Sequence, residues 1–224
     1  MISVVFHWKN YYNLKLMPKG ALVVISAPSG TGKSTLCRQL LRRRNDLRYS
    51  ISCTTRAPRP GEKDGRHYFF LDAEEFKRRV QRHEFLEWAV VHGHYYGTPR
   101  HFVETSLRAG HWLLLAVDVQ GAAAIRRRLP DSVLIFLVPP SWEALRERLA
   151  GRRDDSGSVA TRLANARAEL AAAKSYDYFV VNDELARAVV QIECILTAER
   201  LRTSRRELSG LPERERSPRV LQED

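Results

Sequence analysis

The sequence predicts an α/β protein with a doubly wound parallel sheet, a phosphate loop (P-loop), an inserted subdomain and a mobile lid. Three observations lead to this fold class. Short apolar runs alternate with longer amphipathic stretches from Ala21 onward, as in parallel strands joined by crossover helices. A glycine-rich stretch follows the first apolar run. The alternation is interrupted twice, between about residues 51 and 98 and at residues 151–158.

The apolar runs predict the strands of the sheet, and the amphipathic stretches predict its helices. The predicted strands are residues 21–26, 112–117, 132–138 and 178–181. The predicted helices are residues 33–44, 120–128, 141–150 and 183–203, with Asp183 as the side-chain cap of the last helix.

The two interruptions predict the subdomain and the lid. Residues 51–98 contain Pro/Gly loops, the aromatic-rich runs HYFFL and EFLEWAVV, and one short helix that Asp72 and Glu75 open as a capping box. Residues 151–158, GRRDDSGS, are polar and charged between two helices. This composition suits a mobile lid over about residues 150–162, so the core is expected in residues 19–50 and 99–206.

Composition narrows the class of protein. A chain of 224 residues with 44% hydrophobic content is long enough for one well-buried core. The net charge of +11 indicates an acidic partner, which is a phosphorylated ligand, a nucleic acid or a membrane surface. The three cysteines form no C-x-x-C pair, and the sequence shows neither a membrane-spanning run nor a signal peptide. We therefore expect a soluble protein of the reducing cytoplasm.

The two ends of the chain differ from its middle. Met17 directly precedes the first convincing strand, so one hypothesis is that translation starts there and that residues 1–16 are an artefact or a disordered arm. The alternative is an element that packs on the domain edge. From about Ser204 the chain is charged and rich in arginine, which predicts a fraying helix end and then a disordered tail over residues 207–224.

The stretch APSGTGKS resembles the phosphate-loop pattern G-x-x-x-x-G-K-[ST], with Ala27 in place of the first glycine. In such a loop, backbone N–H groups converge on phosphate oxygens at a helix N-terminus. Lys33 is expected to reach the transferring phosphates, and Ser34 to contact a Mg²⁺ ion that bridges them. Position 27 is the turn before the phosphate contact, so alanine is tolerated there. The expected ATP site is Ala27, Pro28, Ser29, Gly30, Thr31, Gly32, Lys33, Ser34 and Thr35.

A second basic segment indicates a phosphorylated acceptor. Arg56 and Arg59 lie three residues apart in the proline-rich run CTTRAPRPGE. Two guanidinium groups in a stiff loop can grip one phosphate with paired hydrogen bonds. By itself the segment is equally compatible with a solvated basic loop.

Eight separated segments together resemble the guanylate kinase family, which phosphorylates GMP with ATP. They are SAPSGTGKST, CTTRAPRPGE, GRHYFF, EFLEWA, HYYGTPR, VDVQGA, LAGR and YDYFVVND, within about residues 19–206. The resemblance implies ATP and Mg²⁺ as cofactors, GMP and dGMP as acceptors, and a GMP-binding role for the inserted subdomain. Bacterial members often self-associate, which makes a homo-oligomer through the long C-terminal helix a further expectation.

The resemblance also assigns roles to residues. It implies that Arg56, Arg59, Tyr68 and Tyr96 hold the GMP phosphate. Around the guanine ring it implies Ser52, Glu87, Thr98 and Asp118. Guanine presents N1–H and its 2-amino group as neighbouring donors, which a carboxylate accepts together, whereas adenine would leave a buried Glu87 unpaired.

On the ATP side, the resemblance implies that Arg148, Arg152 and Arg162 close over the phosphates with the lid and that Asn182 lies near the adenine. Together with Lys33 and Arg56, these arginines form the expected catalytic set, which acts by positioning and charge neutralisation during in-line transfer. No protein metal site is expected, because the seven histidines show no ligand spacing. His92 and His94 are expected to face solvent.

Four features depart from the family pattern. Ala116 replaces an aspartate that is common two residues before Asp118, which raises the question of how the metal is organised. Arg153 replaces a lid glycine, and aligning Arg162 requires a one-residue gap. Cys53 stands where serine or histidine is frequent, with little effect expected.

Three other functions are compatible with parts of the sequence. A phosphopeptide-binding module of the same fold would not require the intact Gly32-Lys33-Ser34. A kinase of phosphorylated sugars would have no use for Ser52, Glu87 and Asp118. Nucleic-acid binding would use the basic charge, but two anionic nucleotides already account for many basic residues, so nucleic acid is not expected as the main partner.

Overall fold

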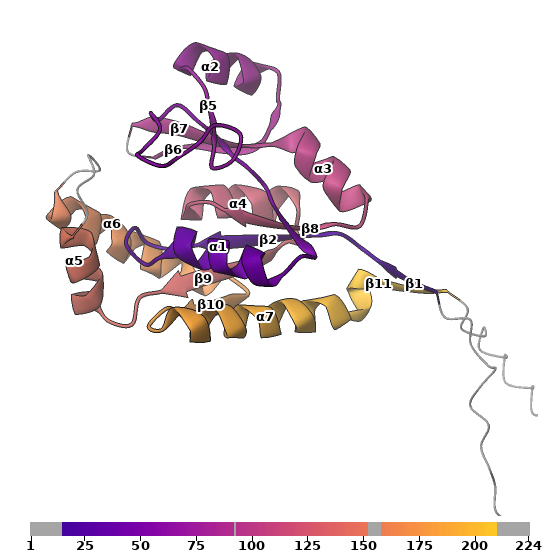
Figure 1. The fold of residues 1–224 in the computed structure, drawn as a ribbon. Helices are drawn as coiled ribbons and strands as arrows, with labels where there is room; N and C mark the ends of the chain where they lie inside the picture. The colour runs from indigo at the N-terminus through magenta and orange to yellow at the C-terminus, as the bar shows by residue number, and fades with distance from the viewer. Residues whose placement is uncertain (1–14, 92, 152–157, 210–224) are drawn as a thin grey trace, which may run out of the picture.

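Two β-sheets organise the chain, which the computed structural model describes over residues 15–91, 93–151 and 158–209. The larger sheet is parallel throughout and has the strand order β10-β9-β2-β8-β3. The smaller sheet, of order β5-β4-β7-β6, stands above it in Figure 1. The predicted α/β class with a parallel sheet is confirmed.

The elements of the larger sheet agree closely with the prediction. Its strands are β2 (Ala21–Ser26), β3 (Leu47–Tyr49), β8 (Trp112–Ala116), β9 (Val133–Val138) and β10 (Tyr178–Val181). Its helices are α1 (Lys33–Arg43), α3 (Arg100–Arg108), α4 (Val119–Arg128), α5 (Trp142–Ala150), α6 (Val159–Ala171) and α7 (Leu185–Leu201). The four predicted strands and four predicted helices are present, whereas β3, α3 and α6 were not predicted. No helix within the described ranges is long and apolar enough to cross a membrane.

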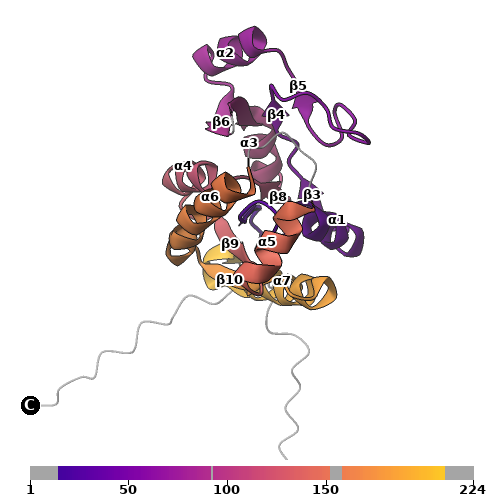
Figure 2. The ribbon, with the colours of Figure 1, turned by 90° about the vertical axis from the view of Figure 1, so that its left-hand side faces the viewer.

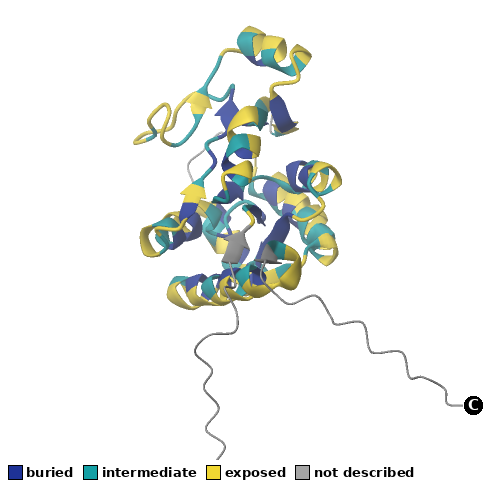
Figure 3. Cartoon of the chain, turned by 90° about the vertical axis from the view of Figure 1, so that its right-hand side faces the viewer, coloured by how far each residue is buried: buried dark blue, intermediate teal, exposed yellow. Residues whose placement is uncertain are grey.

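Strand β2 shows why helices cover both faces of this sheet. Successive side chains of a strand point to opposite faces. Val23 and Ile25 join a core with α1 and α7, while Leu22 and Val24 join a second core with α3 and α4. Helices therefore flank the sheet on both sides (Figure 2), and the strands between them are buried (Figure 3).

The smaller sheet has its own core. Its elements are β4 (Cys53–Thr54), β5 (Phe69–Phe70), α2 (Ala73–Gln81), β6 (Phe85–Val91) and β7 (His94–Pro99). Phe76 of α2 stacks on Phe85 of β6 with ring centroids 4.5 Å apart. The predicted capping of α2 by Asp72 is confirmed, because its side chain accepts a 2.7 Å hydrogen bond from the backbone of Glu75. The Glu75 carboxylate accepts from Arg78 and Arg79.

A third, two-stranded sheet joins distant parts of the chain. Strand β1 (Lys15–Pro18) pairs antiparallel with β11 (Arg206–Ser209). The predicted disordered tail is therefore wrong for residues 207–209, which pair with a strand 190 to 194 residues away in sequence. Local composition does not reveal this pairing. Of the segment 1–16, residues 15 and 16 belong to β1; residues 1–14, like the rest of the tail from residue 210, lie outside the described residues.

The predicted cap of the last helix is also wrong. Helix α7 begins at Leu185, and its N-cap is Glu184, which makes no side-chain cap. Asp183 is one residue too early to reach the N–H groups of the first turn. Its carboxylate instead accepts a 2.6 Å hydrogen bond from the Glu184 backbone and pairs with Arg187.

The predicted lid joins α5 to α6. Leu145 and Leu149 of α5 pack against Ala166 of α6. Residues 152–157, which include the predicted lid residues Arg152 and Arg153, lie outside the described residues, so the lid stays a prediction.

Candidate active site

The loop between β2 and α1 has the geometry of an anion-binding loop. Gly30 and Gly32 adopt φ values of 86° and 95°, a left-handed conformation that favours glycine. Gly32 is the N-cap of α1, and this cap has no side-chain hydrogen bond. The N–H groups of the first turn therefore point into the loop without a side-chain acceptor, which is the arrangement that receives phosphate oxygens.

Ala27 fits this loop without strain. Within the described residues, His83 is the only residue other than glycine with a positive φ, so Ala27 has an ordinary negative φ. Ala27 is also buried, with 8% of its surface exposed. The first glycine of the pattern is therefore not required here.

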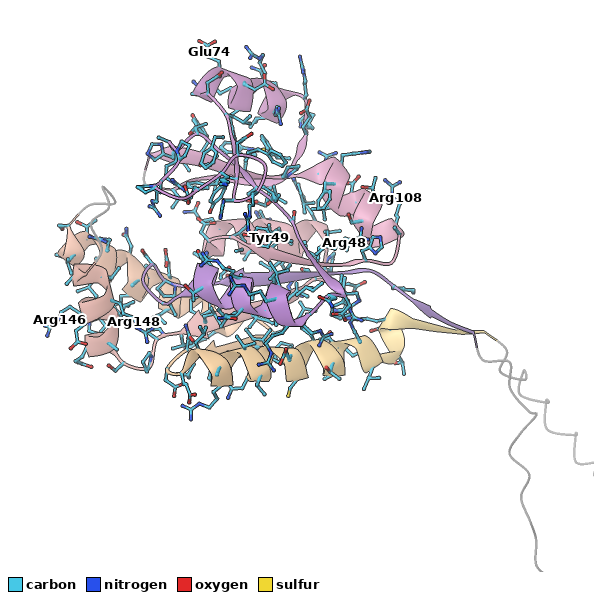
Figure 4. The ribbon with its side chains drawn as sticks, viewed as in Figure 1. Arg48, Tyr49, Glu74, Arg108, Arg146 and Arg148 are labelled. Carbon is cyan, nitrogen blue, oxygen red and sulfur yellow. The ribbon has the colours of Figure 1, made fainter. Side chains whose placement is uncertain are left out.

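Asn182, at the end of β10, supports the loop from behind. Its side chain donates a 2.6 Å hydrogen bond to the carbonyl of Thr31. Arg148, on the side of α5 that faces the rest of the domain (Figure 4), donates to the Asn182 carbonyl at 3.3 Å and 3.4 Å. A Cβ on Gly32 would lie 2.7 Å from the Asn182 amide, so this contact also requires glycine at position 32.

Lys33 is held at the floor of the site. Its Nζ donates a 2.8 Å hydrogen bond to the carbonyl of Val117 at the end of β8. Burial lowers the pKa of Lys33, although the nearby Asp118 and Glu169 carboxylates oppose this shift. A desolvated ammonium group of this kind interacts strongly with phosphate because little water screens it.

One continuous cleft of about 240 Å³ joins this loop to the smaller sheet. The phosphate-loop residues on its wall are Ala27, Pro28, Ser29, Gly30, Gly32, Lys33, Ser34 and Thr35. The acceptor-side residues on its wall are Ser52, Arg59, Tyr68, Glu87, Tyr96 and Asp118. Six of the eight residues predicted for the acceptor therefore share one cavity with the phosphate loop.

The two predicted phosphate-binding arginines are organised by Glu62, which sequence reasoning did not single out. Its carboxylate accepts a 3.0 Å hydrogen bond from Arg56 Nη2 and a 2.8 Å bond from the Arg59 backbone. Arg56 Nε also donates to the Tyr96 hydroxyl at 3.3 Å. Partial burial would raise the pKa of Glu62, but the bonds from Arg56 and Arg59 outweigh it and lower the pKa. A single carboxylate three residues after Arg59 was the available sequence signal.

Glu87 is a buried carboxylate that faces the cleft from β6. The pairing of β6 with β7 is irregular between Phe85 and Glu87, so Phe85, Leu86 and Glu87 are all buried despite being consecutive. Glu87 Oε1 accepts a 2.5 Å hydrogen bond from the Thr98 hydroxyl. Burial raises the pKa of Glu87 to about 7, with a smaller upward contribution from Asp118. The bond from Thr98 opposes this shift.

Asp118 has a structural role besides the predicted one. It is the N-cap of α4, and its Oδ1 accepts a 2.8 Å hydrogen bond from the backbone N–H of Gly121. The start of α4 thus fixes this carboxylate in the cleft wall. Helix N-termini stabilise negative charge, so Asp118 is held as an oriented acceptor.

Glu169 of α6 is a third carboxylate in the cleft, and it was not predicted. Burial raises its pKa to about 7, while Lys33 opposes the shift. It follows Arg162 and Ala166 at helical spacing, and both of these are buried. A glutamate on the buried stripe of a helix was therefore the sequence signal, but α6 itself was not predicted.

The chain is similar to known proteins over most of its length. The family model for guanylate kinase matches residues 19–199. The chain belongs to the guanylate kinase family. It is 50% identical over 189 residues to the guanylate kinase of Symbiobacterium thermophilum, covering 84% of this chain and 90% of that one. It is 49% identical over 195 residues to the guanylate kinase of Rhizobium meliloti, covering 86% and 89%.

A solved structure agrees with this assignment. The guanylate kinase from Anaplasma phagocytophilum superposes with a TM-score of 0.74 at 36% identity, covering 85% of this chain and 92% of that one. Guanylate kinases phosphorylate GMP with ATP, so the chain is a kinase and a phosphotransferase.

Some residues assigned by the guanylate kinase resemblance do not line the cleft. They are Thr31, Arg56, Thr98, Arg148, Arg162 and Asn182. Thr98 and Arg56 lie one hydrogen bond behind the wall, bonded to Glu87 and Tyr96. Arg162 is buried within α6, with 5% of its surface exposed, and Asn182 contacts the loop backbone. His94 is exposed, as predicted, whereas His92 lies outside the described residues.

Proposed function

We propose that this guanylate kinase family member transfers the γ-phosphoryl group of ATP in line to GMP, and also to dGMP, in the cytoplasm as part of purine nucleotide metabolism. The observation that carries the proposal is the single cleft in which a phosphate loop faces a buried glutamate on a neighbouring sheet. The products are ADP and GDP or dGDP.

Selection for guanine rests on Glu87 and its neighbours. The Glu87 carboxylate accepts from the N1–H and 2-amino groups of guanine, while Ser52 donates to O6. Adenine has neither the N1–H nor the 2-amino group. It would leave the buried Glu87 carboxylate without these hydrogen bonds, at a cost of about 1–3 kcal/mol. These contacts address the base rather than the 2′-hydroxyl, which is why the proposal includes dGMP.

The acceptor phosphate is positioned from the smaller sheet. Arg59, Tyr68 and Tyr96 line the cleft on that side, and Arg56 supports the Tyr96 hydroxyl. Arg59 in the cleft wall, Arg56 directly behind it and two phenolic donors match a phosphate dianion. An ionised phosphate is already a nucleophile, so the protein supplies positioning and charge rather than a general base.

Mg²⁺ fits the donor set of the cleft. Ser34 is exposed at the start of α1, and Asp118 and Glu169 add carboxylate oxygens, which are the ligands that Mg²⁺ prefers. The described residues contain no cluster of three or more metal-binding side chains, so the nucleotide phosphates and Ser34 would hold the ion. When bound, Mg²⁺ neutralises charge on the phosphates.

Lys33 would stabilise the charge of the transferring group, and the phosphate loop would orient it by backbone hydrogen bonds. Arg148, Arg152 and Arg162 remain proposed partners that come closer when the lid closes and excludes water. In the described conformation Arg148 is bonded to Asn182, so this role requires a rearrangement of α5 or its side chain.

The proposal is tested by steady-state ADP formation from Mg-ATP with GMP, dGMP, AMP, CMP and UMP as separate acceptors. GMP and dGMP should support turnover, and AMP should be a poor acceptor. Equal use of AMP and GMP, or no turnover with any of the five, would contradict the proposal.

A further inference from the structure

Gly121 in the first turn of α4 touches both carboxylates of the acceptor site. Its N–H donates to Asp118 Oδ1 at 2.8 Å. A Cβ at this position would lie 2.9 Å from Glu87 Oε2, 3.1 Å from Asp118 Oδ1 and 3.2 Å from Val117 Cβ. Oxygen atoms of Glu87 and Asp118 therefore lie next to the position that the Cβ of any other residue would occupy.

The backbone does not require glycine here. Gly121 lies inside a helix and is not among the glycines with positive φ. Alanine is the more favourable residue in a helix interior, so glycine at such a position is unfavourable unless packing demands it. The three nearest atoms to a Cβ here belong to the two cleft carboxylates and Val117, so the packing demand comes from the site.

We propose that Gly121 is a specificity-determining residue, because its missing side chain leaves the space in which the Glu87 carboxylate takes up its guanine-reading position beside Asp118. The inference rests on the proposed function and deepens it. Glu87 is held from two sides: the Thr98 hydroxyl bonds Oε1, and Oε2 rests over Gly121. Gly121 acts through Glu87 and is a positioning residue.

A methyl group at position 121 must displace the Glu87 carboxylate. Asp118 is tied to the start of α4 by its hydrogen bond to the same residue, and Val117 belongs to the backbone segment that leaves β8. Of the three neighbours, the Glu87 carboxylate is the group that can move, because it is the end of a longer side chain. Its displacement changes the alignment of the acceptor with guanine but leaves the phosphate loop intact.

The test is Gly121→Ala, alone and in a Glu87→Ala background, with Ala123→Gly as the control. Ala123 is an exposed residue of the same helix, so its variant reports any general sensitivity to the stability of α4. Gly121→Ala should raise the KM for GMP at least about tenfold, leave the KM for ATP within about twofold, and lower the preference for GMP over AMP. In the Glu87→Ala background it should change these values less than about threefold.

The outcomes separate this inference from the proposed function. A folded Gly121→Ala with wild-type KM and preference, or the same fold-change in both backgrounds, overturns the inference alone. Wild-type protein that does not prefer GMP overturns the proposed function and the inference with it. Thermal melts cover the case of a poorly folded variant: the fall in melting temperature should be smaller in the Glu87→Ala background, and an equal fall overturns the inference.

Discussion

The phosphate loop and the acceptor side of the cleft are built in two different ways, and in the proposed function each binds one phosphate-bearing ligand. The loop offers backbone N–H groups from one short stretch, with two glycines in left-handed conformations and the half-buried Lys33 beneath. The acceptor side offers side chains from β6, β7, the segment between β4 and β5, and the residues just before β4 and α4. Bonds such as Arg56 to Glu62 and Thr98 to Glu87 hold them. Backbone recognition tolerates a substitution such as Ala27 outside its two left-handed positions, whereas side-chain recognition depends on each supporting contact.

The largest effect on activity is expected at Lys33, the charged residue of the phosphate loop. Lys33→Ala should reduce kcat by roughly 10³-fold, because it removes the cation that faces the transferring phosphates. The melting temperature should not fall, because the variant also removes a desolvated charge. Steady-state ADP formation and a thermal melt measure both quantities, and a kcat within tenfold of wild type would contradict the role of Lys33.

The second effect is a pH dependence on the acceptor side. Burial raises the pKa of Glu87 to about 7, and the proposed contact with guanine uses the ionised carboxylate. The kcat/KM for GMP should therefore fall by up to about tenfold per pH unit as pH drops below 7. Glu87→Gln is the control, because it retains the titration of the GMP phosphate itself. Identical pH profiles for the two proteins would remove Glu87 from the base site.

The raised pKa of Glu87 also predicts how the stability of the protein changes with pH. Its pKa is higher in the folded protein than the ordinary value of 4.5, so between these values the folded state binds more protons than the unfolded state. The Glu87 contribution to the free energy of unfolding is thus largest below pH 4.5 and is lost as pH rises to about 7. Comparing wild type with Glu87→Gln across this interval isolates that contribution.

A smaller effect on the KM for GMP is expected at Glu62, which contacts the predicted phosphate-binding arginines rather than the proposed ligand. Glu62→Gln should raise the KM for GMP about fivefold, because it weakens the charge-assisted bonds that hold Arg56 and Arg59. The KM for ATP should stay within about twofold. Equal changes in both KM values would show that the variant disturbs the whole cleft rather than the acceptor side.

The smallest effect on activity is expected at Ala27, which replaces the first glycine of the phosphate-loop pattern. Ala27→Gly should leave the KM for ATP within about twofold, because Ala27 already has an ordinary φ. It should lower the free energy of unfolding by about 0.5–1 kcal/mol, since glycine loses more conformational freedom on folding. A clear gain in ATP affinity would show that alanine impairs the loop.

This contrast also explains what the sequence could predict. The loop is local, so its spacing alone predicted the positions of Gly30, Gly32 and Lys33. The acceptor side is assembled from distant segments, and Glu87 was placed there only by family resemblance, because the strand irregularity that buries it depends on its partner β7. Glu169 was missed because its helix, α6, was not predicted.

Other differences have similar causes. Asn182 was expected near the adenine, but only the folded chain brings it within 2.6 Å of Thr31. The pairing of β1 with β11 joins the two ends of the domain, which no local pattern indicates. The fold class was predictable because apolar runs determine the strands of a buried parallel sheet.

The most direct test of the central claim is the ratio of kcat/KM for GMP to that for AMP in wild type and in Glu87→Gln. The amide presents a donor to guanine where the carboxylate accepted, so the ratio should fall about 100-fold. Turnover that remains selective for GMP to the same degree would contradict the claim that Glu87 reads the base in the cleft it shares with the phosphate loop.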